Sequence, residues 1–234
     1  RSVRSSSWPL GDSSVTQQEF FELVLSVLEK LQVPYMVAGS VGAMLYGEPR
    51  LTNDMDVVIE LLPGRATALV EAFPEDEFYV PPVEAVRDAI GRRGQFNVIH
   101  MGSGAKVDFV VRKETEFARE EFFRRRRVVF SKRLQCQSAS PEDIIIAKLI
   151  AYREGRSEKH IADIRGIIAV SGQTLDWGYL QAWLRKLGLS AHARQAGLIA
   201  SQGRGNAYMG KYVIVVDDDI DPSNLDEVIW ALTT

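Results

Sequence analysis

VAGSVGAMLYGEPRLTNDMDVVIE, residues 37–60, is the stretch that decides the fold, because a Gly-Ser turn is followed at short range by Asp54 and Asp56 at the head of an apolar strand. Alternate side chains of a strand share a face, so these two carboxylates point the same way, roughly 6 to 7 Å apart, while Met55 points into the core. Two like charges side by side do not both stay ionised without a compensating positive charge. The stretch therefore predicts a site for Mg²⁺ or Mn²⁺.

Gly39 and Ser40 precede the two aspartates, and this order resembles the signature of the DNA-polymerase-beta-like nucleotidyltransferase superfamily: a Gly-Gly or Gly-Ser pair, a short helix, then Asp-x-Asp on a strand. The run YGEPRLTNDMDV further resembles the branch of minimal nucleotidyltransferases and AbiEii-type toxins. The places of its Tyr-Gly-x-x-Arg-x-Ser/Thr-x-Asp pattern are filled by Tyr46, Gly47, Arg50, Thr52 and Asp54. The resemblance spans about residues 17–200.

The superfamily expects a third carboxylate on a later strand, and KVDFVV supplies Asp108. This segment follows the alternating run QFNVIHM as the second arm of a hairpin turned at residues 102–104. The resemblance implies an α/β (α+β) fold, a mixed sheet with flanking helices followed by a helical C-terminal part. The alternation of helices and strands along the chain agrees with it.

Two plainer interpretations stand beside this one. Asp-x-Asp at a strand start can be a solvated edge, and Ser40 can be an N-cap that satisfies the first amide groups of a helix. The fold can also persist after catalysis is lost, as a nucleotide-binding or antitoxin module.

The composition sets broader bounds. With 234 residues, 46% hydrophobic and 25% charged, the chain can bury a full core. No apolar run approaches the length of a membrane span, which is roughly 18 residues or more. A single cysteine, Cys136, excludes an internal disulfide and fits a reducing cytoplasm. We expect a cytoplasmic protein with no membrane contact.

Composition also divides the chain into four parts. Six serines in the first fourteen residues predict a disordered leader over 1–14. The nucleotidyltransferase core is expected over 15–137, opened by a helix with a capping box of Thr16 and Glu19. A helical C-terminal part is expected over 138–201, its first helix capped by Ser140 and ended by Gly155. A strand-helix tail takes 202–234.

Two groups of charged residues outside the motif each allow two interpretations. The run of four arginines at 124–127 is either a solvated helix end or a phosphate track. The branch carries a Lys and an Asp in consecutive C-terminal helices, matched by Lys148 and Asp163. Lys148 lies either near the nucleotide, held by Asp163, or in a purely structural ion pair. For His160 an ordinary surface position is the default.

The last 33 residues, with KYVIVVDDDIDP leading into NLDEV, resemble a fragment of the UbiD-type decarboxylase family. The acids at the end of this strand are either a cation site or ordinary turn chemistry. The family's flavin-derived cofactor needs more of the fold than 33 residues, so a decarboxylase is the weakest of the functions considered. We expect a fused fragment or an accessory strand.

The resemblance implies an enzyme that moves a nucleoside monophosphate from an NTP to a hydroxyl, releasing pyrophosphate. Catalytic and metal-binding roles fall to Asp54, Asp56 and Asp108. Nucleotide-binding roles fall to Gly39, Ser40, Arg50, Thr52 and Lys148. The acceptor is a tRNA, a protein or a small molecule such as an aminoglycoside, and an antitoxin-type partner fits the toxin branch.

Overall fold

The first helix shows how local sequence fixes an element. In the computed structural model, which describes residues 15–201, α1 (Gln17–Lys30) begins at Thr16. The Thr16 hydroxyl accepts from the Glu19 N–H at 3.3 Å, and the Glu19 carboxylate accepts from the Thr16 N–H at 2.9 Å, which is the predicted capping box. The buried side of α1 carries Phe20, Val24 and Leu28.

A seven-stranded mixed sheet lies at the centre of the molecule, in the order β3-β4-β5-β2-β1-β7-β6. Its strands are β1 (Tyr35–Val37), β2 (Asp54–Ile59), β3 (Phe78–Tyr79), β4 (Gln95–His100), β5 (Lys106–Val111), β6 (Arg126–Val129) and β7 (Gln135–Ser138). β2 pairs with β5 in parallel and with β1 in antiparallel, and β4 and β5 form the predicted hairpin. The mixed α/β sheet confirms the predicted fold class.

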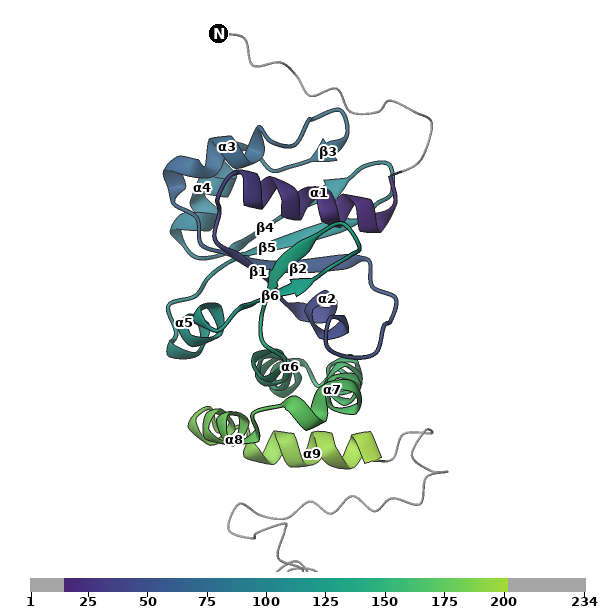
Figure 1. Cartoon of the computed structure of the whole chain (residues 1–234). Helices are drawn as coiled ribbons and strands as arrows, with labels where there is room; N and C mark the ends of the chain where they lie inside the picture. The colour runs from purple at the N-terminus through teal and green to yellow at the C-terminus, as the bar shows by residue number, and fades with distance from the viewer. Residues whose placement is uncertain (1–14, 202–234) are drawn as a thin grey trace, which may run out of the picture.

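Helices cover both faces of this sheet. They are α2 (Gly39–Met44), α3 (Ala66–Val70), α4 (Val83–Gly91), α5 (Glu116–Phe123), α6 (Pro141–Gly155), α7 (Glu158–Ser171), α8 (Trp177–Lys186) and α9 (Ser190–Ser201), with short 3-10 turns at Pro63–Arg65 and Gly172–Thr174. α1, α3 and α4 lie on one face, and α2, α6 and α7 on the other, with α8 and α9 beyond them (Figure 1).

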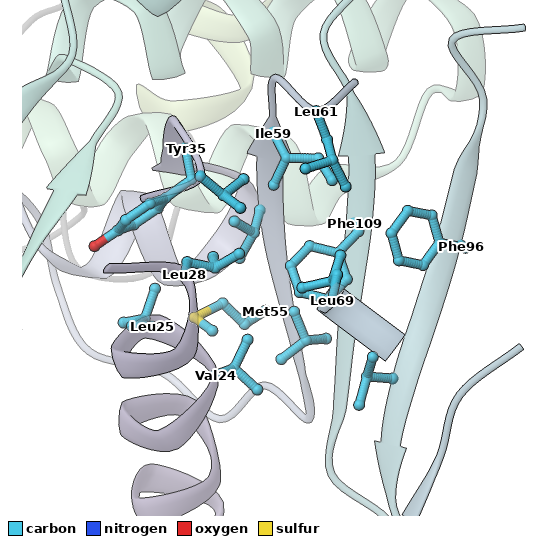
Figure 2. Packing of buried hydrophobic residues seen from close by; sticks show 14 of the residues in the cluster. Val24, Leu25, Leu28, Tyr35, Met55, Ile59, Leu61, Leu69, Phe96 and Phe109 are labelled. Atoms are coloured by element: carbon cyan, nitrogen blue, oxygen red, sulfur yellow. The ribbon is translucent and has the colours of Figure 1, made fainter. Parts of the chain in front are cut away.

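Burial alternates along β2 and β5, which decides which residues face the core. Met55 and Ile59 are fully buried against α1, with Phe109 of β5 beside them (Figure 2). Each large apolar side chain buried in this way contributes about 1.5–3 kcal/mol to folding. Asp54 and Asp56, which flank Met55, therefore face the opposite side of the sheet, where α2, α6 and α7 lie (Figure 1), as the alternation predicts.

The structure contains two strands that the sequence pattern did not indicate, β3 and β7. β7, with the mostly polar sequence QCQS, pairs in parallel with β1 at Val37 and Ser138. The predicted leader at 1–14 and the strand-helix tail at 202–234, with its acidic cluster, lie outside the described residues.

Within residues 15–201 no helix is both long and apolar enough to cross a bilayer.

Candidate active site

The three predicted catalytic acids lie on two adjacent strands. Asp56 of β2 and Asp108 of β5 are register partners, and Asp54 is the register partner of Lys106. Adjacent strands are about 4.8 Å apart, and all four side chains project from the same face of the sheet. The structure thus brings the three predicted acids together and places Lys106 beside them.

Asp56 is the central acid of the three. Burial raises the pKa of Asp56, Lys148 opposes this, and the neighbouring Asp108 and Asp54 raise it further. Its side chain is half-buried, whereas Asp54 is 51% exposed and Asp108 25%. Asp56 is therefore the acid that would gain most from a cation at this face.

Gly39 fixes the turn against this acid. Its φ is +60°, a conformation that residues with a Cβ rarely adopt, and a Cβ at this position would overlap the Asp56 carboxylate. The N–H of Ala38 donates to the Asp56 carbonyl at 2.9 Å. Gly39 does not itself line the cavity described below, so its predicted contact with nucleotide phosphates stays a prediction.

Ser40 is not the helix N-cap of the plainer interpretation. The N-cap of α2 is Ala38, which has no side chain to cap with. The Ser40 hydroxyl instead accepts from Arg50 Nη2 and from Lys148 Nζ, the latter at 3.4 Å, and lies 3.5 Å from Asp163 Oδ2. It belongs to a polar cluster of four residues: Ser40, Arg50, Lys148 and Asp163.

Asp163 holds the two cations of this cluster. Lys148 Nζ lies 2.6 Å from Asp163 Oδ2, and Arg50 Nε donates to Asp163 Oδ1 at 2.6 Å. Burial alone would raise the pKa of Asp163, but the hydrogen bonds from Arg50 and Lys148 outweigh it and hold the pKa below its ordinary value. The expected pairing of Lys148 with Asp163 is therefore present, and it also includes Arg50.

The acids and the polar cluster line one cavity of about 170 Å³. Its walls are Ser40, Arg50, Thr52, Asp54, Asp56, Asp108, Lys148, Lys159, His160 and Asp163. Thr52 is fixed at the rim, because its hydroxyl donates to the Asp54 carbonyl at 3.2 Å and its own carbonyl accepts from Gln17 Nε2 at 2.6 Å. Every predicted site residue except Gly39 therefore reaches the cavity.

Sequence reasoning missed, or gave another role to, two cavity residues, His160 and Lys159, and Lys106 beside the acids. His160 is half-buried and not an ordinary surface residue; burial lowers the pKa of its imidazole, and Lys148 adds to the effect. Lys159 precedes it on α7. Lys106 was not predicted, although the alternation in KVDFVV places it on the same face as Asp108.

A divalent metal was predicted at the three acids, and their fit to it can be judged from the contacts. Carboxylate oxygens suit Mg²⁺ and Mn²⁺. Within residues 15–201 no three His, Cys, Asp or Glu side chains converge as a ready-made metal cage. Instead, Lys106 Nζ lies 2.8 Å from Asp108 Oδ2 and 3.7 Å from Asp54 Oδ2. The ammonium group of Lys106 therefore lies between two of the carboxylates. Carboxylates that hold one cation in this way also suit a divalent metal.

The arginine run does not form a phosphate track at this cavity. Arg124 Nε lies 3.2 Å from Asp143 Oδ2, and its guanidinium stacks 3.7 Å from the centroid of the Tyr179 ring. Arg126 Nη2 lies 3.4 Å from Glu142 Oε2. Glu142 and Asp143 are buried at the start of α6, so Arg124 anchors that helix to the end of α5 and Arg126 anchors it to β6.

Comparison with known proteins finds two kinds of similarity. Residues 158–234 match the model of the 3-octaprenyl-4-hydroxybenzoate carboxy-lyase C-terminal domain. This match begins at the first residue of α7, well ahead of the tail in which the resemblance was expected.

Several of the solved structures that are similar carry nucleotidyltransferase or adenylyltransferase names. ANT(2'')-Ia in complex with adenylyl-2''-tobramycin is 16% identical over 73% of this chain and 97% of its own, with a TM-score of 0.49. An antigenic nucleotidyltransferase-like protein from Paracoccidioides brasiliensis is 21% identical over 75% and 88%, with a TM-score of 0.48. Lincomycin-bound LnuA, a lincosamide antibiotic adenylyltransferase, is 12% identical over 68% and 100%, with a TM-score of 0.46. The chain is thus similar to proteins of both kinds that its motifs resemble.

Proposed function

We propose that the chain is a metal-dependent nucleotidyltransferase that moves a nucleoside monophosphate from an NTP to a hydroxyl group and releases pyrophosphate. The observation that carries the proposal is the cavity itself. Three carboxylates on adjacent parallel strands face Arg50, Lys148 and Ser40 across a space of about 170 Å³. Acids that suit a divalent cation and cations that suit phosphate therefore meet in one place.

The acids would hold Mg²⁺ or Mn²⁺, with Asp56 in the centre and Asp54 and Asp108 beside it. When bound, the metal would neutralise charge on the phosphates and make the acceptor hydroxyl easier to deprotonate. The remaining work falls to the side chains of the polar cluster.

Arg50 and Lys148 would bind phosphate oxygens of the NTP. Asp163 fixes both side chains, so little rotational freedom is lost when a phosphate arrives. The Ser40 hydroxyl accepts from both cations and donates to Asp163 Oδ2 at 3.5 Å, so it helps to hold the two cations in place. The pair of Lys148 and Asp163 would then be positional as well as structural.

A second candidate is a binding module without turnover, such as a regulatory or antitoxin-like protein. The observation that favours it is the ion pair of Lys106 with Asp108, which balances part of the charge that a metal would otherwise balance. Both candidates leave the acceptor or partner to be identified: a tRNA, a protein or a hydroxyl-bearing small molecule.

The deciding experiment incubates the purified chain with Mg²⁺, each α-labelled NTP in turn, and pools of tRNA, cell protein and aminoglycosides. The control is the Asp54→Ala, Asp56→Ala variant. We expect label transferred only by the unmutated chain. Nucleotide binding without transfer would favour the binding module, and transfer by the double variant would refute the assignment of the acids.

A further inference from the structure

Lys106 occupies an unusual place for a surface lysine. It is the register partner of Asp54 and stands two residues before Asp108 on the same face of β5. Its Nζ lies 2.8 Å from Asp108 Oδ2 and 3.7 Å from Asp54 Oδ2. The ammonium group therefore lies between two of the three carboxylates to which the metal is assigned.

The position suits a cation for a general reason. Asp54, Asp56 and Asp108 place three carboxylates on neighbouring positions of two strands, and like charges this close repel one another. A single positive charge between them reduces the repulsion. Lys106 supplies it from within the chain, on a side chain that reaches both strands.

The lysine is also able to leave. Its side chain is 30% exposed, its stem has four flexible methylene groups, and its ammonium group is held by ion pairs with Asp108 and Asp54. A partly exposed ammonium group is held only weakly by its carboxylates. A divalent ion carries twice the charge and accepts several oxygen ligands at once, so it can replace the lysine.

We propose that Lys106 is an exchangeable counter-ion of the acidic site, which competes directly with the divalent metal. The proposal rests on the proposed function, since the metal is the one required for nucleotide transfer. In the metal-free chain Lys106 neutralises Asp54 and Asp108. When the metal binds, the partly exposed ammonium group moves into solvent and the three carboxylates become free to act as ligands.

The test is the affinity for Mn²⁺ alone, measured by electron paramagnetic resonance of free Mn²⁺ at constant ionic strength. Lys106→Met removes the competing charge, and we expect it to bind Mn²⁺ about tenfold more tightly than the unmutated chain. Lys106→Arg keeps the charge and should bind as the unmutated chain does. Lys30→Met, an exposed lysine at the end of α1 on the other face, controls for the loss of one positive charge.

Thermal melting gives a second readout, because a metal that binds the folded chain raises its melting temperature. The unmutated chain should melt only slightly higher in Mg²⁺ than in EDTA, because the metal must displace Lys106. Lys106→Met should melt lower in EDTA and recover in Mg²⁺. A variant that folds only when Mg²⁺ is present would support the proposal in the same way.

The outcomes separate this proposal from the proposed function. Equal Mn²⁺ affinity of Lys106→Met and the unmutated chain, with binding abolished by Asp56→Asn, would overturn the role of Lys106 and leave the enzyme in place. Absence of Mn²⁺ binding from every variant would overturn the metal site itself. Tighter binding by Lys30→Met as well would reduce the effect to net charge and also overturn the competition.

Discussion

Replacing Asp163 by Asn would leave Lys148 as a buried cation without its anion. The side chains of Lys148 and Asp163 are 8% and 3% exposed, and their charged groups lie 2.6 Å apart. Asn keeps the shape of the side chain but not its charge. Arg50, the other partner, is 33% exposed and can turn toward water, so most of the loss falls on Lys148.

The size of the effect follows from this burial. Removing one partner of a buried ion pair typically destabilises a protein by about 3–5 kcal/mol. For a chain of this size each kcal/mol shifts the melting temperature by about 2–4 °C, which gives an expected loss of about 6–20 °C. An exposed ion pair contributes only about 0–1 kcal/mol, so the same change at Asp88, which is 65% exposed and paired with Arg92, should have little effect.

Urea unfolding of Asp163→Asn, Lys148→Met, Asp88→Asn and the double variant Asp163→Asn, Lys148→Met measures these differences. The double variant leaves no unpaired buried charge in the pair, so it should be more stable than Asp163→Asn alone. A loss below about 1 kcal/mol in Asp163→Asn, or simple addition of the two single effects in the double variant, would show that the pair is not a buried charge pair in solution.

Three further predictions concern the acids and the turn. Gly39→Ala should lower the free energy of unfolding by about 1–3 kcal/mol or more, because φ is +60° and the added Cβ overlaps Asp56; an unchanged urea midpoint would contradict this. Asp56→Asn should abolish nucleotide transfer. It should also stabilise the metal-free chain at pH 7, because burial raises the pKa of Asp56 and the folded state therefore disfavours the ionised carboxylate. At pH 3 the carboxyl group is protonated and the variant should bring no gain, which urea unfolding in EDTA at both pH values tests. Burial, with Asp143 adding to it, raises the pKa of Glu121 from 4.5 to about 8, so the folded state binds the extra proton and stability should fall as pH rises from about 4.5 toward 8. At pH 7 the folded state keeps Glu121 protonated although the unfolded chain ionises it, which should cost up to about 3 kcal/mol. Glu121→Gln should recover this loss, and a parallel pH dependence of the variant and the unmutated chain would refute the assignment.

Local patterns predicted the parts of the fold that depend on neighbouring residues. The capping pair at Thr16, the cap at Ser140 and the alternation around Met55 all follow from contacts within a few positions of the chain, and all are present. The resemblance added Asp108, Lys148 and Asp163, which lie far apart in sequence. The cavity brings these residues together with Asp54 and Asp56.

Local sequence patterns could not predict features that depend on contacts between residues far apart in the chain. β7 has no run of β-branched residues, and what makes it a strand is its pairing with β1, about one hundred positions earlier. The face on which Lys106 lies follows from alternation, but the carboxylates its flexible tip contacts depend on the parallel pairing of β2 with β5. His160 reaches the cavity only because α7 packs against α2 and the loop after it.

The close approach of Gly47 to Gly166 has a practical consequence for dividing this chain. A Cβ on Gly47 would lie 2.8 Å from the backbone of Gly166, so the motif loop and α7 touch without side chains between them. A cut between α6 and α7 would put Arg50 and Lys148 in one fragment and Asp163 in the other. Arg50 and Lys148 would then lack their carboxylate partner, and Asp163 would lack both cations. The loop between Gly155 and Glu158 is therefore a place to split the protein into two pieces whose binding to each other would restore these ion pairs.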